Sequence, residues 1–290
     1  MATFVALFAA AVAYAAVLTL AAVGFLLLYK ATGVVNFAHG DLLTLGGFLA
    51  WWLIVDHGLP VLVGSLIAIV LLAGAGVVLE RVAYAPLRRR SPMTVVVATL
   101  AAALVIRALL GIWLGSTPRR LPSPVGEGAW HVAGAAVAWQ RVLIVGVAVV
   151  VVGGLLYTFH RTSFGRQVRA LAADPEAAKL CGVRVRRVSM IAWALSGALA
   201  ALAGILVAPL TVLDLNFGFA IMLGGLAAAV AGGFGNLGGA VVGCLGVGLV
   251  QLLVGGYWLR DYAGALPYVA LFLVIVLRPR GLFSTTATRL

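Results

Sequence analysis

The segment GVVNFAHGDLLTLGGF, residues 33–48, carries side chains that could recognise the charged groups of a small solute. Asn36, His39 and Asp41 lie among several glycines there. A break in a membrane helix frees backbone N–H and C=O groups that can hold a solute's charged ends, and ionisable groups at membrane depth usually face a cavity. The alternative is an interfacial turn, in which Asp41 caps the following helix and His39 is solvated. The residues alone leave both interpretations open, and the candidate site residues are Asn36, Phe37, His39 and Gly40.

A second glycine-rich segment, residues 223–243, offers the same chemistry. Small residues let helices approach closely, and such packing accounts for most of its glycines. The run GGFGNLGG at 232–239 nevertheless favours a break in the helix around Phe234 and Asn236. The candidate site residues of this segment are Gly232, Gly233, Phe234, Gly235 and Asn236.

The segment DPEAAKLCGVRVRRV, residues 174–188, is charged and suits docking to a partner. Asp174 can cap a helix, Pro175 suits its first position and Gly182 can end it. A short helix with small residues on one face could fit a groove of another subunit and transmit rigid-body motion. The alternative is a loop helix held at the lipid headgroups by its arginines. The candidate docking residues are Asp174, Pro175, Glu176, Ala177, Ala178, Lys179, Leu180 and Gly182.

The residue pattern of an enzyme is missing from the sequence. Its four histidines are scattered, and its two cysteines form neither a disulfide framework nor part of a metal-ligand cluster. The phosphate-binding pattern G-x-x-x-x-G-K-[ST] is missing too, so ATP hydrolysis would need another subunit. We therefore expect no catalytic residue, no metal and no cofactor on this chain.

The elements that must position these segments are membrane helices. The chain is 64% hydrophobic and 10% charged, whereas soluble chains are about 45–50% apolar. Apolar stretches of about 18 residues or more predict membrane-spanning helices. We predict an all-α, polytopic membrane protein with about 8–9 transmembrane helices, some of them broken or re-entrant, in a single domain over residues 1–290. The expected spans are 4–29, 42–55, 60–80, 93–114, 141–159, 189–208, two within 220–256, and 263–277.

The positive charge is concentrated in a few places. Most of the twenty basic residues lie in segments 81–90, 161–188 and 278–289. Cytoplasmic loops of membrane proteins collect Lys and Arg, so we place these segments and the C-terminus in the cytoplasm. The net charge of +12 then reflects topology and contact with anionic lipid, and no nucleic-acid partner is expected. Arg107, inside an expected span, has no evident acidic partner, and it either snorkels or lines a pore.

Four landmarks, in this order, resemble the permease subunit of ABC importers for branched-chain amino acids. They are TGVVNFAHGDLLTLGGFLA, RTSFGRQVRALAADPEAAKLCGVRVRRV, GGFGNLGGAVVG and LRPRGLF, and the resemblance runs along nearly the whole chain. It implies that residues 174–182 form the coupling helix of a cytoplasmic loop, 161–188. It also implies the cytoplasmic (inner) membrane of a bacterium, a second permease subunit or a second copy, two ATP-binding subunits and a periplasmic or extracytoplasmic substrate-binding protein.

The expected function is thus the membrane-spanning permease subunit of an ATP-driven importer for branched-chain amino acids, which forms the translocation path and couples to a separate ATPase. The same machinery for urea or short amides is an alternative. A stand-alone ion-coupled carrier is another, but it would need an acidic relay inside the membrane. The eight acidic residues are expected near span ends or in loops.

Overall fold

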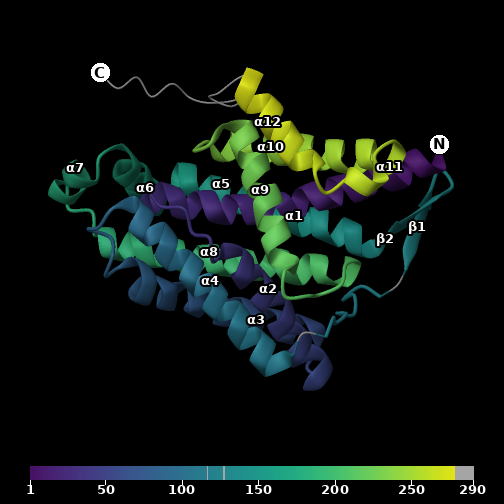
Figure 1. The fold of residues 1–290 in the computed structure, drawn as a ribbon, viewed down its shortest axis with the longest axis horizontal. Helices are drawn as coiled ribbons and strands as arrows, with labels where there is room; N and C mark the ends of the chain where they lie inside the picture. The colour runs from purple at the N-terminus through teal and green to yellow at the C-terminus, as the bar shows by residue number, and fades with distance from the viewer. Residues whose placement is uncertain (116, 127, 278–290) are drawn as a thin grey trace.

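The computed structural model describes residues 1–115, 117–126 and 128–277, and it consists almost entirely of helices (Figure 1). The α-helices are α1 (Ala2–Thr32), α2 (His39–Trp51), α3 (Val61–Leu79), α4 (Pro92–Leu114), α5 (Trp139–Arg161), α6 (Ser163–Ala173), α7 (Pro175–Leu180), α8 (Val185–Val207), α9 (Phe217–Gly233), α10 (Leu237–Leu249), α11 (Gly255–Tyr257) and α12 (Leu266–Leu277). Turns of π-helix extend α2, α3 and α10 at Trp52–Asp56, Glu80–Tyr84 and Val250–Val254. Short 3₁₀ turns lie at Ala208–Leu210 and Arg260–Tyr262. The predicted landmark LRPRGLF and the C-terminal tail fall almost wholly outside the described residues.

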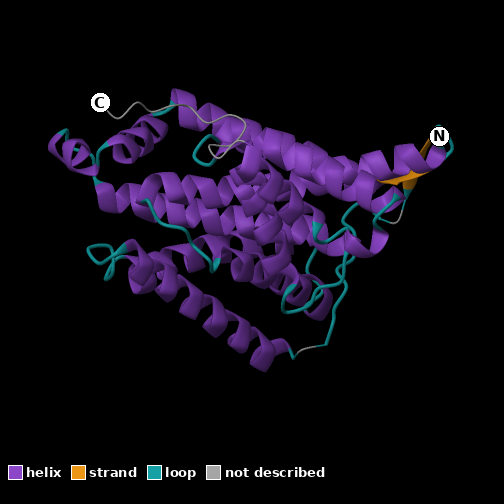
Figure 2. Cartoon of the chain, turned by 45° about the horizontal axis from the view of Figure 1, so that its top comes forward, coloured by secondary structure: helices purple, strands orange, loops and turns teal. Residues whose placement is uncertain are grey.

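The bundle has two distinct ends. At one, which we call the α7 end, α6 and α7 project beside the C-terminal end of α1 (Figure 1). At the other, the hairpin end, the N-terminus lies beside two short strands, and Figure 2 shows these strands at the opposite extreme of the molecule from α7. Any function that links a partner at one end to a solute at the other must act along these helices.

Helix α1 is the axis of the bundle. It is apolar around its whole circumference, and its side chains from Val17 to Leu28 are all buried. A helix that is hydrophobic on all sides is typically enclosed by other elements, and α1 contacts α5, α8, α9 and α10. The other helices are therefore arranged around the first one.

Two helices begin inside the bundle and do not cross it completely. The α1 helix ends at Thr32 with Gly33 in the left-handed conformation (φ 72°), and the chain then returns without helix to His39, where α2 starts. His39 lies against Gly24 of α1, which is about 12 Å back along α1 from its end. Helix α9 begins against the start of α2, where Gly218 packs on the carbonyl oxygen of Gly40. Of the two interpretations that the sequence left open for residues 33–40, this arrangement favours the break inside the bundle.

The described residues support six full-length spans. Among the described residues, six helical stretches are long and apolar enough to span a membrane: Ala2–Thr32, Val61–Tyr84, Pro92–Leu114, Trp139–Arg161, Val185–Leu210 and Leu237–Tyr257. Helices α2, α9 and α12 are shorter. The predicted count of 8–9 is not confirmed, because apolar runs that start inside the bundle resemble full spans in sequence.

A hairpin departs from the predicted all-α description, and one further helix forms inside a predicted loop. Strands β1 (Ala129–Val132) and β2 (Ala135–Ala138) form an antiparallel hairpin in the region predicted to be a loop. Its turn residues, Ala133 and Gly134, both have positive φ, as a two-residue type I′ turn requires. At the other end, α6 forms a helix within the predicted charged loop and buries one face. The two strands and α6 are short and lack a long apolar run, so the sequence did not predict them.

Close helix packing explains many of the glycines, and α3 offers a matched test of this. A Cβ atom at Gly76 would collide with the carbonyl oxygen of Trp193 on α8, whereas one at Gly74 would meet nothing within 4 Å. We expect Gly76→Ala to lower the free energy of unfolding by about 1–3 kcal/mol, because the two backbones must separate. Gly74→Ala should change it by less than about 1 kcal/mol. Thermal unfolding of the purified protein checks both, and equal effects would contradict the packing interpretation.

Candidate functional site

The starts of α2 and α9 are locked together by backbone contacts inside the bundle. The Gly218 N–H donates to Thr44 Oγ1 at 3.0 Å, and the Thr44 hydroxyl donates to the Gly40 carbonyl at 3.2 Å. Because a side chain at Gly218 would collide with the Gly40 oxygen, only glycine fits there. The two partial helices therefore meet at one buried junction, formed by segments far apart in the sequence.

The predicted site residues at residues 36–40 hold this junction in place. Asn36 is 2% exposed, and its Oδ1 accepts a hydrogen bond from the Ala38 N–H at 3.0 Å. The Phe37 N–H donates to Thr99 Oγ1 on α4 at 3.3 Å, which ties the returning segment to a neighbouring helix. These two hydrogen bonds hold the non-helical segment that precedes α2 and so set the residue at which α2 begins.

His39 is completely buried, so it is neither a solvated side chain nor an open wall of a channel. Its Nδ1 lies 3.1 Å from Ser196 Oγ on α8, and its ring packs on Gly24 of α1. The sequence-based alternative of a solvated His39 is wrong. The ring fixes the depth at which α2 begins relative to both neighbouring helices.

An ion pair that the sequence did not suggest lies at the same junction. Arg107 Nε on α4 donates to Asp41 Oδ1 at 2.9 Å, and Arg107 Nη1 donates to Asn216 Oδ1 at 3.1 Å. The Asp41 side chain is 2% exposed and that of Arg107 is 28% exposed, with the guanidinium 5.5 Å from the ring centre of Phe219. The interpretation of Arg107 as a charge without an acidic partner is therefore wrong.

Two acidic residues lie at helix ends, as predicted, but are buried. Asp41 does lie at a helix end, as predicted, but that end is inside the bundle. Glu80 is 1% exposed near the end of α3, where the hydroxyl of Ser189 donates to its Oε1 at 3.2 Å.

The second predicted group, residues 232–236, forms the turn between α9 and α10 at the α7 end. Gly233 and Gly235 have φ of 116° and 97°, and Gly232 packs on the carbonyl oxygen of Gly239. Asn236 caps α10 by accepting hydrogen bonds from the backbone N–H groups of residues 238 and 239, at 3.0 and 3.3 Å. The predicted break is confirmed, and the glycines serve close packing as well.

The structure does not bring the two predicted groups together into one cavity. Phe234 packs on Tyr29, with ring centres 4.6 Å apart. The ring of Phe25 lies between the groups, 6.3 Å from Phe234 and 6.4 Å from His39. An aromatic side chain of α1 thus separates the buried junction from the α7 end.

Helix α7 forms as the sequence predicted. Asp174 Oδ1 accepts hydrogen bonds from the N–H groups of Glu176 and Ala177 at 2.9 and 3.1 Å, and Pro175 occupies the first turn. The Gly182 N–H donates to the Lys179 carbonyl at 2.9 Å, and Gly182 has φ of 80°. The helix is therefore closed at both ends by its own residues.

The two faces of α7 differ. Ala178 is 4% exposed and seats the helix against the rest of the chain, so it is not available to a partner. Ala177 is exposed, and Leu180 is 91% exposed. Ala177 and Leu180 are thus the apolar side chains of α7 that remain accessible to a partner.

A bundle of apolar helices, two of which begin inside it, beside a charged helix at one end, defines a multi-pass membrane transporter subunit. The chain belongs to the family of branched-chain amino acid transport system permease components, whose model matches residues 7–276.

Individual relatives agree with this family. The chain is 28% identical over 279 residues to the high-affinity branched-chain amino acid transport system permease protein LivH of Escherichia coli (strain K12), covering 91% of this chain and 90% of that protein. It is 27% identical over 280 residues to the permease protein BraD of the corresponding system of Pseudomonas aeruginosa, covering 91% of each. The solved structure of PsaBC from Streptococcus pneumoniae shares the fold, with a TM-score of 0.52 at 14% identity over 93% of this chain and 91% of that one.

Proposed function

We propose that this chain is the membrane-spanning permease subunit of an ATP-driven importer for branched-chain amino acids. The observation that carries the proposal is its relation over 91% of its length to LivH and BraD, both named as permeases of high-affinity branched-chain amino acid transport systems. Transport of urea or short amides has no comparable support. A stand-alone proton-coupled carrier has no such support either, since the buried Asp41 is paired with Arg107.

The proposed location is the inner membrane of a bacterium, with the loop 161–188 and the C-terminus in the cytoplasm. The partners would be a second permease subunit or a second copy, two ATP-binding subunits and an extracytoplasmic substrate-binding protein. Ala177 and Leu180 would contact the ATPase, while Ala178 anchors α7 to the chain's own helices. Because α7 is capped and short, a movement of its partner would shift it as one piece.

The proposed translocation path runs beside the junction of α2 and α9. Asn36, Phe37, His39 and Gly40 would shape it by fixing where α2 starts, and the turn at 232–236 would lie where it opens at the α7 end. The Arg107 guanidinium, partly exposed on the flank of the junction, is the charged group best placed to meet a zwitterionic solute.

Crosslinking at Cys181 tests the proposed contact with the ATPase. This native cysteine is exposed immediately after α7, whereas Cys244 is buried. A thiol-reactive bifunctional reagent should therefore join the assembled wild-type permease to its ATP-binding subunit, and Cys181→Ser should abolish that product. Absence of a crosslink in a complex that transports would remove α7 from the ATPase interface.

The predicted role of Asn36 has its own test. We expect Asn36→Leu to reduce uptake at least tenfold while the subunits still co-purify. The substitution removes the hydrogen bond that Asn36 accepts from the Ala38 N–H, which contributes about 1 kcal/mol, and so shifts the start of α2. Asn36→Asp keeps a side-chain oxygen that can accept the hydrogen bond from the Ala38 N–H, so it is the matched control for the geometry of the turn. Unchanged uptake by the leucine variant would remove this segment from the path.

A further inference from the structure

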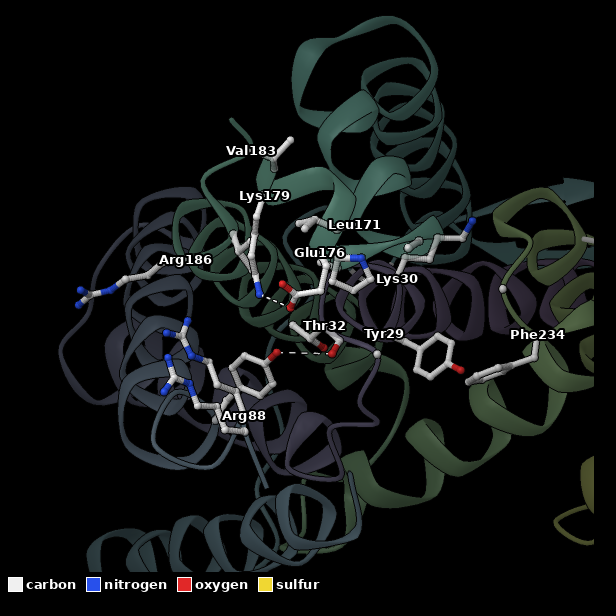
Figure 3. Close-up of a pocket in the computed structure, with 18 of the residues that line it drawn as sticks. Tyr29, Lys30, Thr32, Arg88, Leu171, Glu176, Lys179, Val183, Arg186 and Phe234 are labelled. Carbon is white, nitrogen blue, oxygen red and sulfur yellow. Dashed lines mark hydrogen bonds and ion pairs between the residues drawn. The ribbon is translucent and has the colours of Figure 1, made fainter. Parts of the chain in front are cut away.

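A large cleft opens at the α7 end, between α7 and the ends of α1, α3 and α9 (Figure 3). It has a volume of about 1310 Å³. The proposed function places the opening of the path at the turn 232–236, which forms one wall of this cleft, and assigns nothing to the other walls.

The cleft gathers positive charge from four separate segments. Its basic lining residues are Lys30 of α1, Arg88 and Arg89 of the loop after α3, Lys179 of α7, and Arg186 of α8. The acidic lining residue is Glu176, whose carboxylate is already paired with Lys179 at 2.6 Å.

The remaining cations lack carboxylate partners. Within the described ranges, Lys30, Arg88, Arg89 and Arg186 have no carboxylate within ion-pair distance. The Lys30 ammonium lies over the ring of Phe159, 5.2 Å from its centre, which leaves the three arginines as the main charges of the cleft. Three positive charges around one cavity repel one another and create a positive potential that attracts an anion. The cleft is thus electrostatically suited to an anionic ligand.

The rest of the lining mixes polar side chains (Thr32, Tyr84, Asn236) with apolar ones, and the apolar ones indicate which kind of anion would fit. Leu171 and Val183 line the side near α7, and Phe234 packs on Tyr29 at the opposite side. Aromatic side chains at the ends of membrane helices typically lie at headgroup depth. A cavity with cations on some walls and aliphatic and aromatic groups on others fits an amphiphile better than a freely soluble polyanion.

We propose that this cleft binds the phosphate headgroup of an anionic phospholipid, with the arginines on the phosphate and the apolar wall along the glycerol and upper acyl chains. Basic pockets between membrane helices on the cytoplasmic side bind such headgroups in general. Because the cleft lies directly behind α7, a bound lipid would brace the base of that helix. The binding itself does not depend on which solute the protein transports.

Native mass spectrometry of the intact chain in neutral detergent tests the proposal, with phosphatidylglycerol and phosphatidylcholine as the probe lipids. Phosphatidylglycerol should remain bound and phosphatidylcholine should not. The variant Arg88→Gln, Arg89→Gln, Arg186→Gln should bind phosphatidylglycerol at least tenfold more weakly, since each basic group near an anionic surface contributes about 1 kcal/mol.

The matched control is Arg161→Gln, Arg166→Gln, Arg187→Gln, which removes the same charge from exposed positions that do not line the cleft. It should retain phosphatidylglycerol, and thermal unfolding should show that both triple variants remain folded. Equal loss in both variants, or equal binding of both lipids, would overturn the proposal.

Two further arms distinguish the source of the anion. Inorganic phosphate should fail to displace the lipid, and displacement at a comparable concentration would make this a site for free anions. Phosphatidylglycerol should also stay bound when the permease is assembled with its ATP-binding subunits. Its exclusion from that complex would mean that the partner protein fills the cleft.

Discussion

Arg107→Leu should abolish uptake and lower the free energy of unfolding by about 3 kcal/mol. The substitution leaves the carboxylate of Asp41, 2% exposed, without the guanidinium that neutralises it at 2.9 Å. Breaking a buried ion pair by removing one partner typically costs about 3–5 kcal/mol, and the partial exposure of Arg107 favours the lower value. The same change releases Asn216 at the start of α9, so both halves of the junction lose a polar contact with α4. Thermal unfolding and uptake by the reconstituted complex give the two measurements.

The double variant Asp41→Asn, Arg107→Gln separates stability from transport. It removes both charges while keeping polar side chains of similar size, so most of the lost stability should return, because no buried charge remains unpaired. Uptake should stay low if Arg107 meets the solute. If the double variant transports at the wild-type rate, the pair is purely structural.

Leu180→Asp should reduce ATP-driven uptake at least tenfold without unfolding the permease. Leu180 is 91% exposed, so a charge there costs the isolated chain little, whereas burying that charge in an apolar groove of a partner costs several kcal/mol. Co-purification of the ATP-binding subunit and the ATPase activity of the complex report on the contact directly.

Leu180→Met is the matched control, since it keeps an apolar side chain of similar volume and should retain nearly full uptake. An aspartate variant that binds its ATPase and transports normally would show that this end of α7 stays in solvent in the assembled complex. The lipid interaction proposed for the cleft would be unaffected by that result.

Features with a local cause could be predicted from the sequence. Asp174, Pro175 and Gly182 act on the backbone within about one helical turn of their own positions, so the nine residues DPEAAKLCG mark both the start and the end of α7. The breaks at residues 33–40 and 232–239 follow from runs of glycine and polar residues inside apolar stretches. Local backbone chemistry therefore carries most of the information about where the helices stop.

Features that depend on tertiary contacts could not be predicted in the same way. Asp41 and Arg107 lie on different helices, and no periodicity links them. The depth at which α2 begins depends on His39 packing against Gly24 and Ser196, which are also remote in sequence. The number of full spans could not be fixed from the sequence for the same reason, because an apolar segment reveals its hydrophobicity but not where in the bundle it starts.

The central position of α1 has a consequence for biogenesis. This helix precedes its neighbours in synthesis, yet two of the helices that enclose it, α8 and α10, begin only at Val185 and Leu237. Chains are made from the N-terminus, and membrane helices insert first and associate afterwards. Newly inserted α1 must therefore remain in contact with lipid until late in translation, and a nascent chain arrested before α8 would expose the surface that the finished protein hides most completely. Membrane insertases and quality-control proteases would meet this surface before any transport partner does.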